Sequence, residues 1–171
     1  MNLLEQAKFI APDLVEIRRD LHRHPELAFQ EVRTAGIAAR ALENLGCKIR
    51  TEIGITGVIA DLDNGTGPKV AIRADMDALP MQETSGLPYK SKNAGVMHAC
   101  GHDGHTAMLL GAAEALSEKT DKLNGTVKFI FQPAEEGQGG ARYMIGDGAL
   151  DGVDGSMAFT SGIIRNTGRW V

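Results

Sequence analysis

The strongest constraint on the fold of this chain is the alternation of short apolar β-type runs with amphipathic segments along its 171 residues. Apolar and β-rich stretches predict strands over roughly 47–53, 57–63, 69–74 and 126–132, and near 154–160. Apolar residues at helical spacing predict helices over 13–23, 31–45, 104–119 and about 138–146, with His22 and His24 as helix-end residues. The polar stretch 76–98 is expected to be a long surface loop. Strands that alternate with helices predict an α/β domain in which helices flank a central mixed sheet.

Composition excludes several classes of protein. Lys and Arg number 18 and Asp and Glu 22, which gives a formal net charge of −4 without a basic run, so nucleic acid is not an expected partner. The two cysteines, Cys47 and Cys100, cannot form a disulfide framework, which favours a reducing compartment. The N-terminal segment is interrupted by Glu5, Lys8 and Pro12 and does not read as a signal peptide. No stretch approaches the roughly 20 apolar residues of a membrane span, so we expect a cytoplasmic protein without a membrane partner.

Three polar clusters begin where apolar strands are expected to end. They are DMD at 75–77, HACGHDGH at 98–105 and EE at 135–136. In open α/β sheets, ligands bind outside the carboxyl ends of the strands. The three clusters therefore indicate where the chemistry of this chain is to be sought.

The second cluster has the composition of a metal site. Cys100 and His102 are two residues apart, so an extended backbone would point both side chains the same way. Thiolate, imidazole and carboxylate together suit Zn²⁺ or a similar divalent ion. Two alternatives remain: an inert, buried Cys100 with histidines that cap a helix, or a helical face shared by His98, His102 and His105. Gly101 and Gly104 count against a helix there.

The carboxylates of the other clusters fit the same chemistry. One of Glu135 and Glu136 could bind a metal while the other faces substrate as a general base. Alternatively, both simply favour a helix N-terminus. Asp75 and Asp77 point to the same side of a strand end, with turn capping as the alternative. Asp77 and Asp103 are candidates for fixing a histidine tautomer beside the metal.

Four stretches of the chain match a known family in order. They are LHRHPELAFQE (21–31), AIRADMDALPMQE (71–83), YKSKNAGVMHACGHDGHTAMLLGAA (89–113) and FIFQPAEEGQGGARYMI (129–145). On these residues the chain resembles the M20 group of metallopeptidase-like amidohydrolases. Within that group it is most similar to hippurate hydrolases, N-acyl-L-amino acid amidohydrolases and plant auxin-conjugate hydrolases.

The resemblance implies a hydrolase that uses two divalent ions, of Zn, Mn, Co or Ni, to cleave the amide bond of a small N-acyl amino acid such as hippurate. By the family pattern, Cys100 binds or bridges metal, and His102 and Glu136 are ligands. Glu135 is the general base, and Asp77 orients a ligand. The metals polarise the amide carbonyl and lower the pKa of the attacking water from about 15.7 towards 7.

The chain also departs from the family pattern. Family members are much longer, with an inserted domain that dimerises and covers the site, and with further ligand histidines downstream. Here no histidine follows His105, and 155–171 does not match the pattern. We therefore expect residues 1–154 to be the N-terminal part of an M20-type catalytic domain, without the dimerisation domain, and 155–171 to be a divergent or truncated tail. The resemblance implies a homodimer for the full-length family and gives less reason to expect one for this chain.

Three functional hypotheses follow. The first is the N-terminal part of an N-acyl amino acid amidohydrolase. The second is a catalytically incompetent fragment or pseudoenzyme that keeps a partial metal site and binds at most one ion. The third is a cysteine hydrolase with Cys100 as nucleophile and His102 or His105 as base. The third leaves the carboxylates of the other two clusters without a role.

Overall fold

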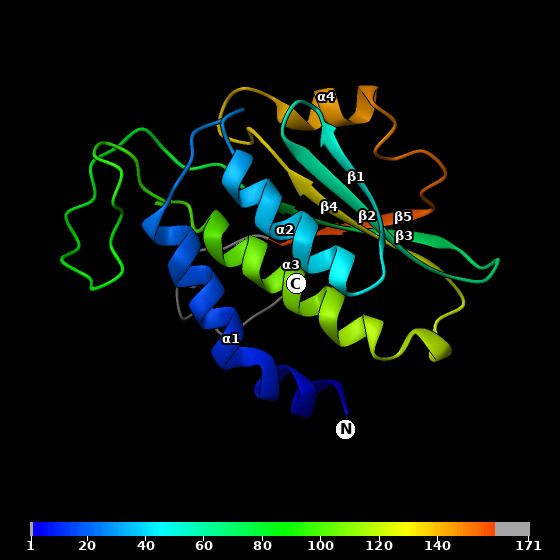
Figure 1. Cartoon of the computed structure of the whole chain (residues 1–171). Coiled ribbons are helices and arrows are strands. Elements are labelled where there is room, and N and C mark those ends of the chain that lie inside the picture. The colour runs from blue at the N-terminus through cyan, green and yellow to red at the C-terminus, as the bar shows by residue number, and fades with distance from the viewer. Residues whose placement is uncertain (1, 160–171) are drawn as a thin grey trace, which may run out of the picture.

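A five-stranded mixed sheet lies at the centre of the computed structural model, which describes residues 2–159. Three long helices lie on one side of the sheet, and a short helix lies on the other (Figure 1). In chain order the elements are α1 (Leu3–Arg23), α2 (Val32–Asn44), β1 (Lys48–Ile53), β2 (Gly57–Asn64), β3 (Lys69–Asp75), α3 (His102–Ser117), η1 (Thr120–Lys122), β4 (Gly125–Gln132), α4 (Gly140–Gly146) and β5 (Gly155–Ala158). This arrangement confirms the predicted α/β class and the mixed sheet.

The strand order is β1-β2-β4-β3-β5, so β4 is inserted between β2 and β3. The β1–β2 and β2–β4 pairs are antiparallel, whereas β3 pairs in parallel with both β4 and β5. In the β3–β4 register, Asp75 lies opposite Gln132. The two strands therefore end at the same edge of the sheet, and the polar segments that follow them emerge side by side.

The main core lies between the sheet and the helices α2 and α3. Alternation along β4 turns Phe129 and Phe131, both fully buried, towards these helices. Leu42 of α2 and Leu109 of α3 are also fully buried in this cluster. The helix α1 packs mainly against α3 rather than on the sheet. The N-terminal end of α3 is therefore held between α1 and the ends of the strands.

The opposite face of the sheet is only partly covered. Ile130 points to this side and packs with Met144 of α4 and with Ala71. The strand β5 is an edge strand, and all four of its residues are exposed. The parallel strands β4, β3 and β5 therefore lack a full helical layer on this face, although parallel strands normally have both faces covered.

The element boundaries agree with the predictions at most positions, and two helices begin earlier than predicted. The first helix starts at Leu3 instead of residue 13, because Asn2 and Glu5 form a capping box and Pro12 is accommodated inside the helix. The helix predicted from residue 104 starts at His102, because Gly101 turns the chain into it with a φ of 81°. The glycines of the motif therefore permit a helix at His102, contrary to the argument from sequence.

The segment between β3 and α3 has no helix or strand, as predicted, but it is not simply a surface loop. Met76, Asp77, Glu83 and His98 within it are all buried. Its ends form isolated β-bridges, one of which joins Leu79 to Met97. The buried ends carry polar side chains into the region beside α3.

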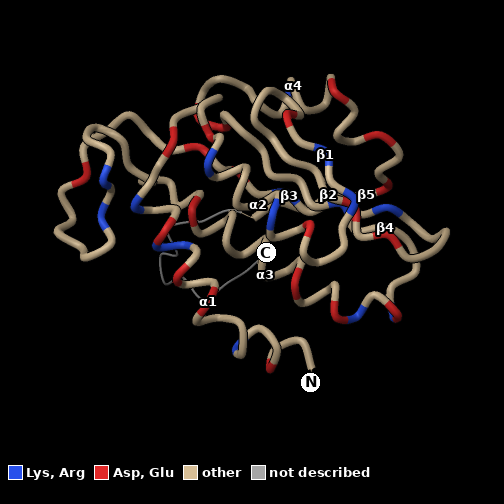
Figure 2. Tube along the Cα trace, in the orientation of Figure 1, with Lys and Arg blue, Asp and Glu red and all other residues tan. Residues whose placement is uncertain are grey.

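Charged residues of both signs are scattered along the described part of the chain, without a run of one sign (Figure 2). Among the described residues, no helix is long and apolar enough to cross a membrane. Of the predicted tail, residues 155–159 are described and include β5, whereas 160–171 lie outside the described residues. The division at residues 154 and 155 stays a prediction.

Replacing Leu109 with alanine should lower the free energy of unfolding by about 2–5 kcal/mol, because it leaves a cavity between α3 and the sheet. Met108, its neighbour on α3, is 44% exposed, and Met108→Ala should change stability by less than about 0.5 kcal/mol. Urea denaturation followed by circular dichroism measures both variants. Equal losses for the two variants would contradict the packing described for α3.

Candidate metal centre and its surroundings

Three segments distant in sequence converge at the edge of the sheet where β3 and β4 end. Asp75 and Asp77 lie at and just beyond the end of β3, and Glu135 and Glu136 follow β4. His102 is the first residue of α3. The three polar clusters, which were expected to begin where strands end, thus meet at one edge of the sheet.

Cys100, His102 and Glu136 form a group that could hold one metal ion. Each offers a ligand atom, and these atoms all lie within 4.8 Å of one another. His102 Nε2 lies 3.9 Å from a carboxylate oxygen of Glu136 and 3.9 Å from one of Glu135. Cys100 is exposed, so the alternative of a buried cysteine is wrong, and the helical turn at His102, rather than extended backbone, places the imidazole near it.

Asp77 links His102 to the loop that carries the two glutamates. His102 Nδ1 lies 2.9 Å from the Asp77 carbonyl oxygen and 3.2 Å from its carboxylate Oδ1. The backbone N–H of Glu136 donates to the other carboxylate oxygen of Asp77, at 2.9 Å. A proton held on Nδ1 leaves the lone pair of Nε2 directed at the glutamates. The predicted orienting role of Asp77 has this geometric basis.

The charges around the group shift its pKa values. Burial alone would raise the pKa of Asp77, but hydrogen bonds from His102 and from the amides of Glu136 and Glu135 lower it below its ordinary value. A hydrogen bond to Glu136, then burial and the nearby carboxylates, raise the pKa of Cys100 to about 11. The excess of negative charge at this position is the kind of field that a divalent cation would neutralise.

Asp75 and His105 form a second group together with His102. The ligand atoms of these three buried residues also lie within 4.8 Å of one another. His105 Nδ1 lies 2.6 Å from Asp75 Oδ1, and Arg73 pairs with the other oxygen at 2.7 Å. Asp75 is therefore part of a buried ionic network, and the alternative of turn capping is wrong for it. Both groups use His102, whose Nε2 lies 3.6 Å from Asp75, so one imidazole lone pair serves only one of them at a time.

A buried polar cluster beside α1 was missed in the sequence. His22 was assigned only to a helix end, but its side chain is 4% exposed and its Nδ1 lies 2.8 Å from Asp103. Its Nε2 lies 3.4 Å from Glu83, and Arg18 also pairs with Asp103. Asp103 thus faces α1 rather than the metal group, so it fixes His22 and no proposed ligand. The sequence signal was the position of His22 within the first family-like stretch, next to Leu21, an apolar residue at helical spacing.

His98, the first histidine of HACGHDGH, lies outside α3. The alternative that His98, His102 and His105 share one helical face is therefore wrong. His98 precedes α3 and lies in contact with the His22 ring, at a centroid distance of 6.3 Å. It is buried, and neither ring nitrogen has a hydrogen-bond partner among the described residues. Burial lowers the pKa of His98 to about 4, so the ring is neutral at pH 7.

The glutamates occupy an irregular loop and not a helix N-terminus, because α4 begins only at Gly140. The loop opens with Ala134, which is fully buried and has a φ of 50°. The Gly140 N–H donates to the Ala134 carbonyl oxygen, and a Cβ at Gly140 would lie 1.8 Å from the Pro133 carbonyl oxygen. Close packing of α4 on this loop therefore requires glycine at position 140.

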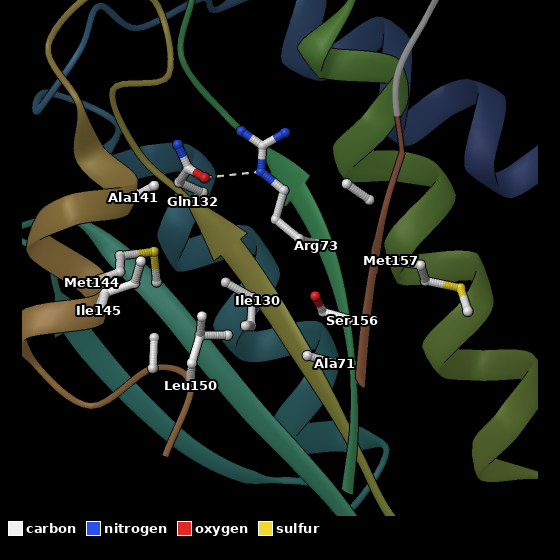
Figure 3. Close-up of a pocket in the computed structure, with 12 residues that line it drawn as sticks. Ala71, Arg73, Ile130, Gln132, Ala141, Met144, Ile145, Leu150, Ser156 and Met157 are labelled. Carbon is white, nitrogen blue, oxygen red and sulfur yellow. Dashed lines mark hydrogen bonds between the residues drawn. The ribbon is translucent and has the colours of Figure 1, made fainter. Parts of the chain in front are cut away.

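A separate pocket of about 320 Å³ lies on the partly covered face of the sheet. Figure 3 shows Ile130, Met144, Ile145 and Leu150 lining its apolar side and Arg73 hydrogen-bonded to Gln132 at its rim. The pocket therefore lies across the sheet from α2 and α3. Its lining is mostly aliphatic, and it contains none of the proposed metal ligands.

An α/β sheet with a thiol, an imidazole and carboxylates gathered at the strand ends defines a candidate metal-dependent hydrolase site. Comparison with protein families gives the particular family: the chain matches the model of peptidase family M20/M25/M40 over residues 71–170. The chain belongs to this family.

Named relatives and solved structures agree with this assignment. N-acetyl-L-cysteine deacetylase of Bacillus subtilis is 51% identical over 142 residues, which are 82% of this chain and 34% of the relative. Hippurate hydrolase of Campylobacter jejuni is 47% identical over 160 residues, 93% of this chain and 41% of the relative. The crystal structure of Bacillus subtilis YXEP, described as a dinuclear metal binding peptidase of the M20 family, has a TM-score of 0.86 and 48% identity over 91% of this chain and 44% of that one. The chain thus spans less than half the length of these relatives.

Glu31 is a further buried carboxylate, and no pattern in the sequence distinguished it. Its oxygens accept from Thr56 and from the backbone N–H of Ala134. Burial raises the pKa of Glu31 above its ordinary value, although these hydrogen bonds oppose the rise. The only signal in the sequence was its place at the end of LHRHPELAFQE.

Glu31→Gln should gain stability relative to the parent as the pH rises. Because the pKa of Glu31 is raised in the folded state, the folded chain retains a proton that the unfolded chain releases above about pH 4.5, and the parent loses stability as pH rises through the folded pKa. Glutamine does not titrate. Urea unfolding of both proteins between pH 4 and pH 7 measures this difference, and a difference that shrinks with rising pH would contradict the assignment.

Proposed function

We propose that the chain is the N-terminal part of the catalytic domain of a metal-dependent amidohydrolase that cleaves N-acyl amino acids. The observation that carries the proposal is the convergence of Cys100, His102 and Glu136, whose ligand atoms lie within 4.8 Å of one another at the ends of β3 and β4. Membership of the M20 family and the enzymes named among the relatives support it.

The residues of the site fit a divalent metal ion. Sulfur, nitrogen and oxygen donors together suit Zn²⁺, Co²⁺ or Ni²⁺ better than the hard cations Mg²⁺ and Ca²⁺, and the family resemblance adds Mn²⁺ to the proposed ions. The hydrogen bonds of His102 Nδ1 to Asp77 leave Nε2 as the donor atom. When bound, such an ion supplies polarisation of an amide carbonyl and a lowered pKa for water.

Within this proposal Glu135 and Asp77 have different roles. Glu135 is the general base, and its carboxylate accepts the proton of the attacking water and later returns it to the leaving amine. Its side chain is 42% exposed, so substrate and water can reach it. Asp77 holds the His102 ring and the Glu136 amide in place, which fixes a ligand and the glutamate loop relative to one another.

A cysteine-hydrolase mechanism fits this geometry less well. The nucleophile would be the Cys100 thiolate, yet Glu136, burial and nearby carboxylates raise the pKa of this thiol to about 11. Reactive cysteines instead lie in electropositive surroundings that lower the pKa. The Nδ1 atoms of His102 and His105 are engaged by Asp77 and Asp75, and the carboxylates of Glu136, Glu135 and Asp75 oppose ionisation of the Cys100 thiol.

The described residues offer donors for one ion, because both candidate groups depend on His102. A second ion of a dinuclear site would need donors beyond these, and the chain of 171 residues has no histidine after His105. We therefore propose that this polypeptide by itself keeps a partial metal site and is catalytically incompetent. Residues 1–154 would be the partial catalytic domain, with 155–171 as a divergent or truncated tail.

The proposal also includes the substrate class, the cellular location and the oligomeric state. The names of the relatives, a deacetylase of N-acetyl-L-cysteine and a hippurate hydrolase, support a small N-acyl amino acid as substrate. The sequence features that favour a reducing compartment support the cytoplasm as its location. The homodimer expected of full-length relatives is not proposed for this chain.

The isolated chain should bind one Co²⁺ ion with a thiolate-to-cobalt absorption band in the near ultraviolet. Cys100→Ser should abolish the band, because the sulfur ligand is lost. Cys47→Ala is the matched control and should keep it, since Cys47 lies in the core near α2. Absorption titration with equilibrium dialysis measures both properties, and a band that survives in Cys100→Ser would exclude Cys100 as a ligand.

Hydrolysis of hippurate and N-acetyl amino acids by the isolated chain should be negligible with added Zn²⁺, Mn²⁺, Co²⁺ or Ni²⁺, because the described donors hold one ion and two are needed. Release of the free amino acid, followed together with bound metal, is the measurement. Robust turnover that Glu135→Gln abolishes would contradict the proposed incompetence of the chain while supporting Glu135 as the base.

A further inference from the structure

Glu31 precedes α2 at the N-cap position but does not cap the helix. Its side chain makes no capping hydrogen bond, although N-cap carboxylates commonly accept from the free N–H groups of the first turn. Glu26 serves that function instead, accepting from the backbone N–H groups of Arg33 and Thr34, both at 2.8 Å. The carboxylate of Glu31 is therefore available for a different contact.

Glu31 ties together two segments that are distant in sequence. Thr56 Oγ1, in the turn between β1 and β2, donates to Glu31 Oε2 at 2.5 Å. The backbone N–H of Ala134, in the loop after β4, donates to Oε1 at 2.8 Å. The Glu31 side chain is fully buried, so these hydrogen bonds are shielded from competition with water.

Unusual backbone conformations gather around this carboxylate. Phe29, Ile55 and Ala134 have φ values of 61°, 85° and 50°. Phe29 lies two residues before Glu31, Ile55 directly precedes Thr56, and Ala134 itself donates to Glu31. Residues other than glycine rarely adopt the left-handed region, and they persist there only where surrounding contacts hold them. The Glu31 carboxylate is one such contact for Ala134.

The position of Ala134 determines where the glutamates can lie. Ala134 directly precedes Glu135, and Asp77 holds the N–H of Glu136 at 2.9 Å. The loop is thus fixed by a buried carboxylate on each side of Glu135: Glu31 before it and Asp77 after it. Of these two, only Asp77 also contacts a proposed metal ligand directly through its side chain.

We propose that Glu31 is a positioning residue for the Glu135–Glu136 loop, acting through the backbone N–H of Ala134. This inference rests on the proposed function, because it matters only if Glu136 binds metal. It assigns a role to the stretch LHRHPELAFQE, which contains none of the proposed metal ligands and not the proposed base. Loss of the carboxylate would let Ala134 relax and would move Glu136 away from Cys100 and His102.

The test compares Glu31→Met, Glu31→Gln and Glu26→Met in the full chain. Methionine keeps the length of the side chain but cannot accept the Ala134 N–H effectively. Glutamine can still accept this N–H through its oxygen while its NH₂ group donates to the Thr56 hydroxyl. Glu26→Met removes the cap of α2 without a contact to the loop, and so it controls for a general loss of stability.

The readouts are the Co²⁺ dissociation constant and the thiolate-to-cobalt band, recorded below the melting transition of every variant. Glu31→Met should weaken Co²⁺ binding about tenfold or more, as expected for the loss of a group that orients a ligand. Glu31→Gln should restore binding to within about twofold of the parent, and Glu26→Met should leave it unchanged within the same margin.

The outcomes separate this inference from the proposed function. If the parent chain binds no Co²⁺ with a thiolate band, the metal site itself is contradicted. If the parent binds and Glu31→Met binds as tightly as Glu26→Met, the positioning role is wrong while the metal site stands. Should Glu31→Met fail to fold, Thr56→Val and Thr56→Ser take its place: weaker binding in valine that serine restores supports the network, and equal binding in both contradicts it.

Discussion

The parallel pairing of β3 with β4 is the constraint on which the rest of the site depends. Because Asp75 lies opposite Gln132 in this register, the segments that follow the two strands leave the sheet together. Those segments carry Asp77 and the two glutamates, and α3 places His102 against them. A shift of the register by one residue would turn the strand side chains to the opposite face, and the carboxylates would no longer meet the imidazole.

Burial of charge at this edge is tolerated because each carboxylate has partners. Asp77 accepts from His102 and from a backbone amide, and Asp75 from His105 and Arg73. Isolated buried carboxylates are very costly, so such groups need hydrogen bonds or opposite charges. At Cys100 the nearby carboxylates of Glu136, Glu135 and Asp75 instead raise the pKa of the thiol. The proposed metal ion is the group that would balance this position.

The two faces of the sheet are covered to different extents by the described residues. On one face, α2 and α3 bury Phe129 and Phe131 fully. On the other, α4 covers part of β4 and leaves a mostly aliphatic pocket and an exposed edge strand (Figures 1 and 3). Parallel strand pairs, such as those of β3 with β4 and β5, occur mostly in sheets that have helices on both faces. The partial layer accords with a chain that spans 34–41% of the length of relatives such as the deacetylase and the hippurate hydrolase.

Periodicity, glycines and the motif HACGHDGH were enough, from the sequence alone, to predict the strands, most of the helices and the residues that converge at the site. Local patterns predict such features because side-chain alternation and helical spacing are properties of neighbouring residues. The sequence could not show that His22 is buried against Asp103, or that Glu31 supports Ala134, because these contacts join segments 81 and 103 residues apart. Only the packing of α1 on α3, and of the β1–β2 turn beside the glutamate loop, brings these partners together.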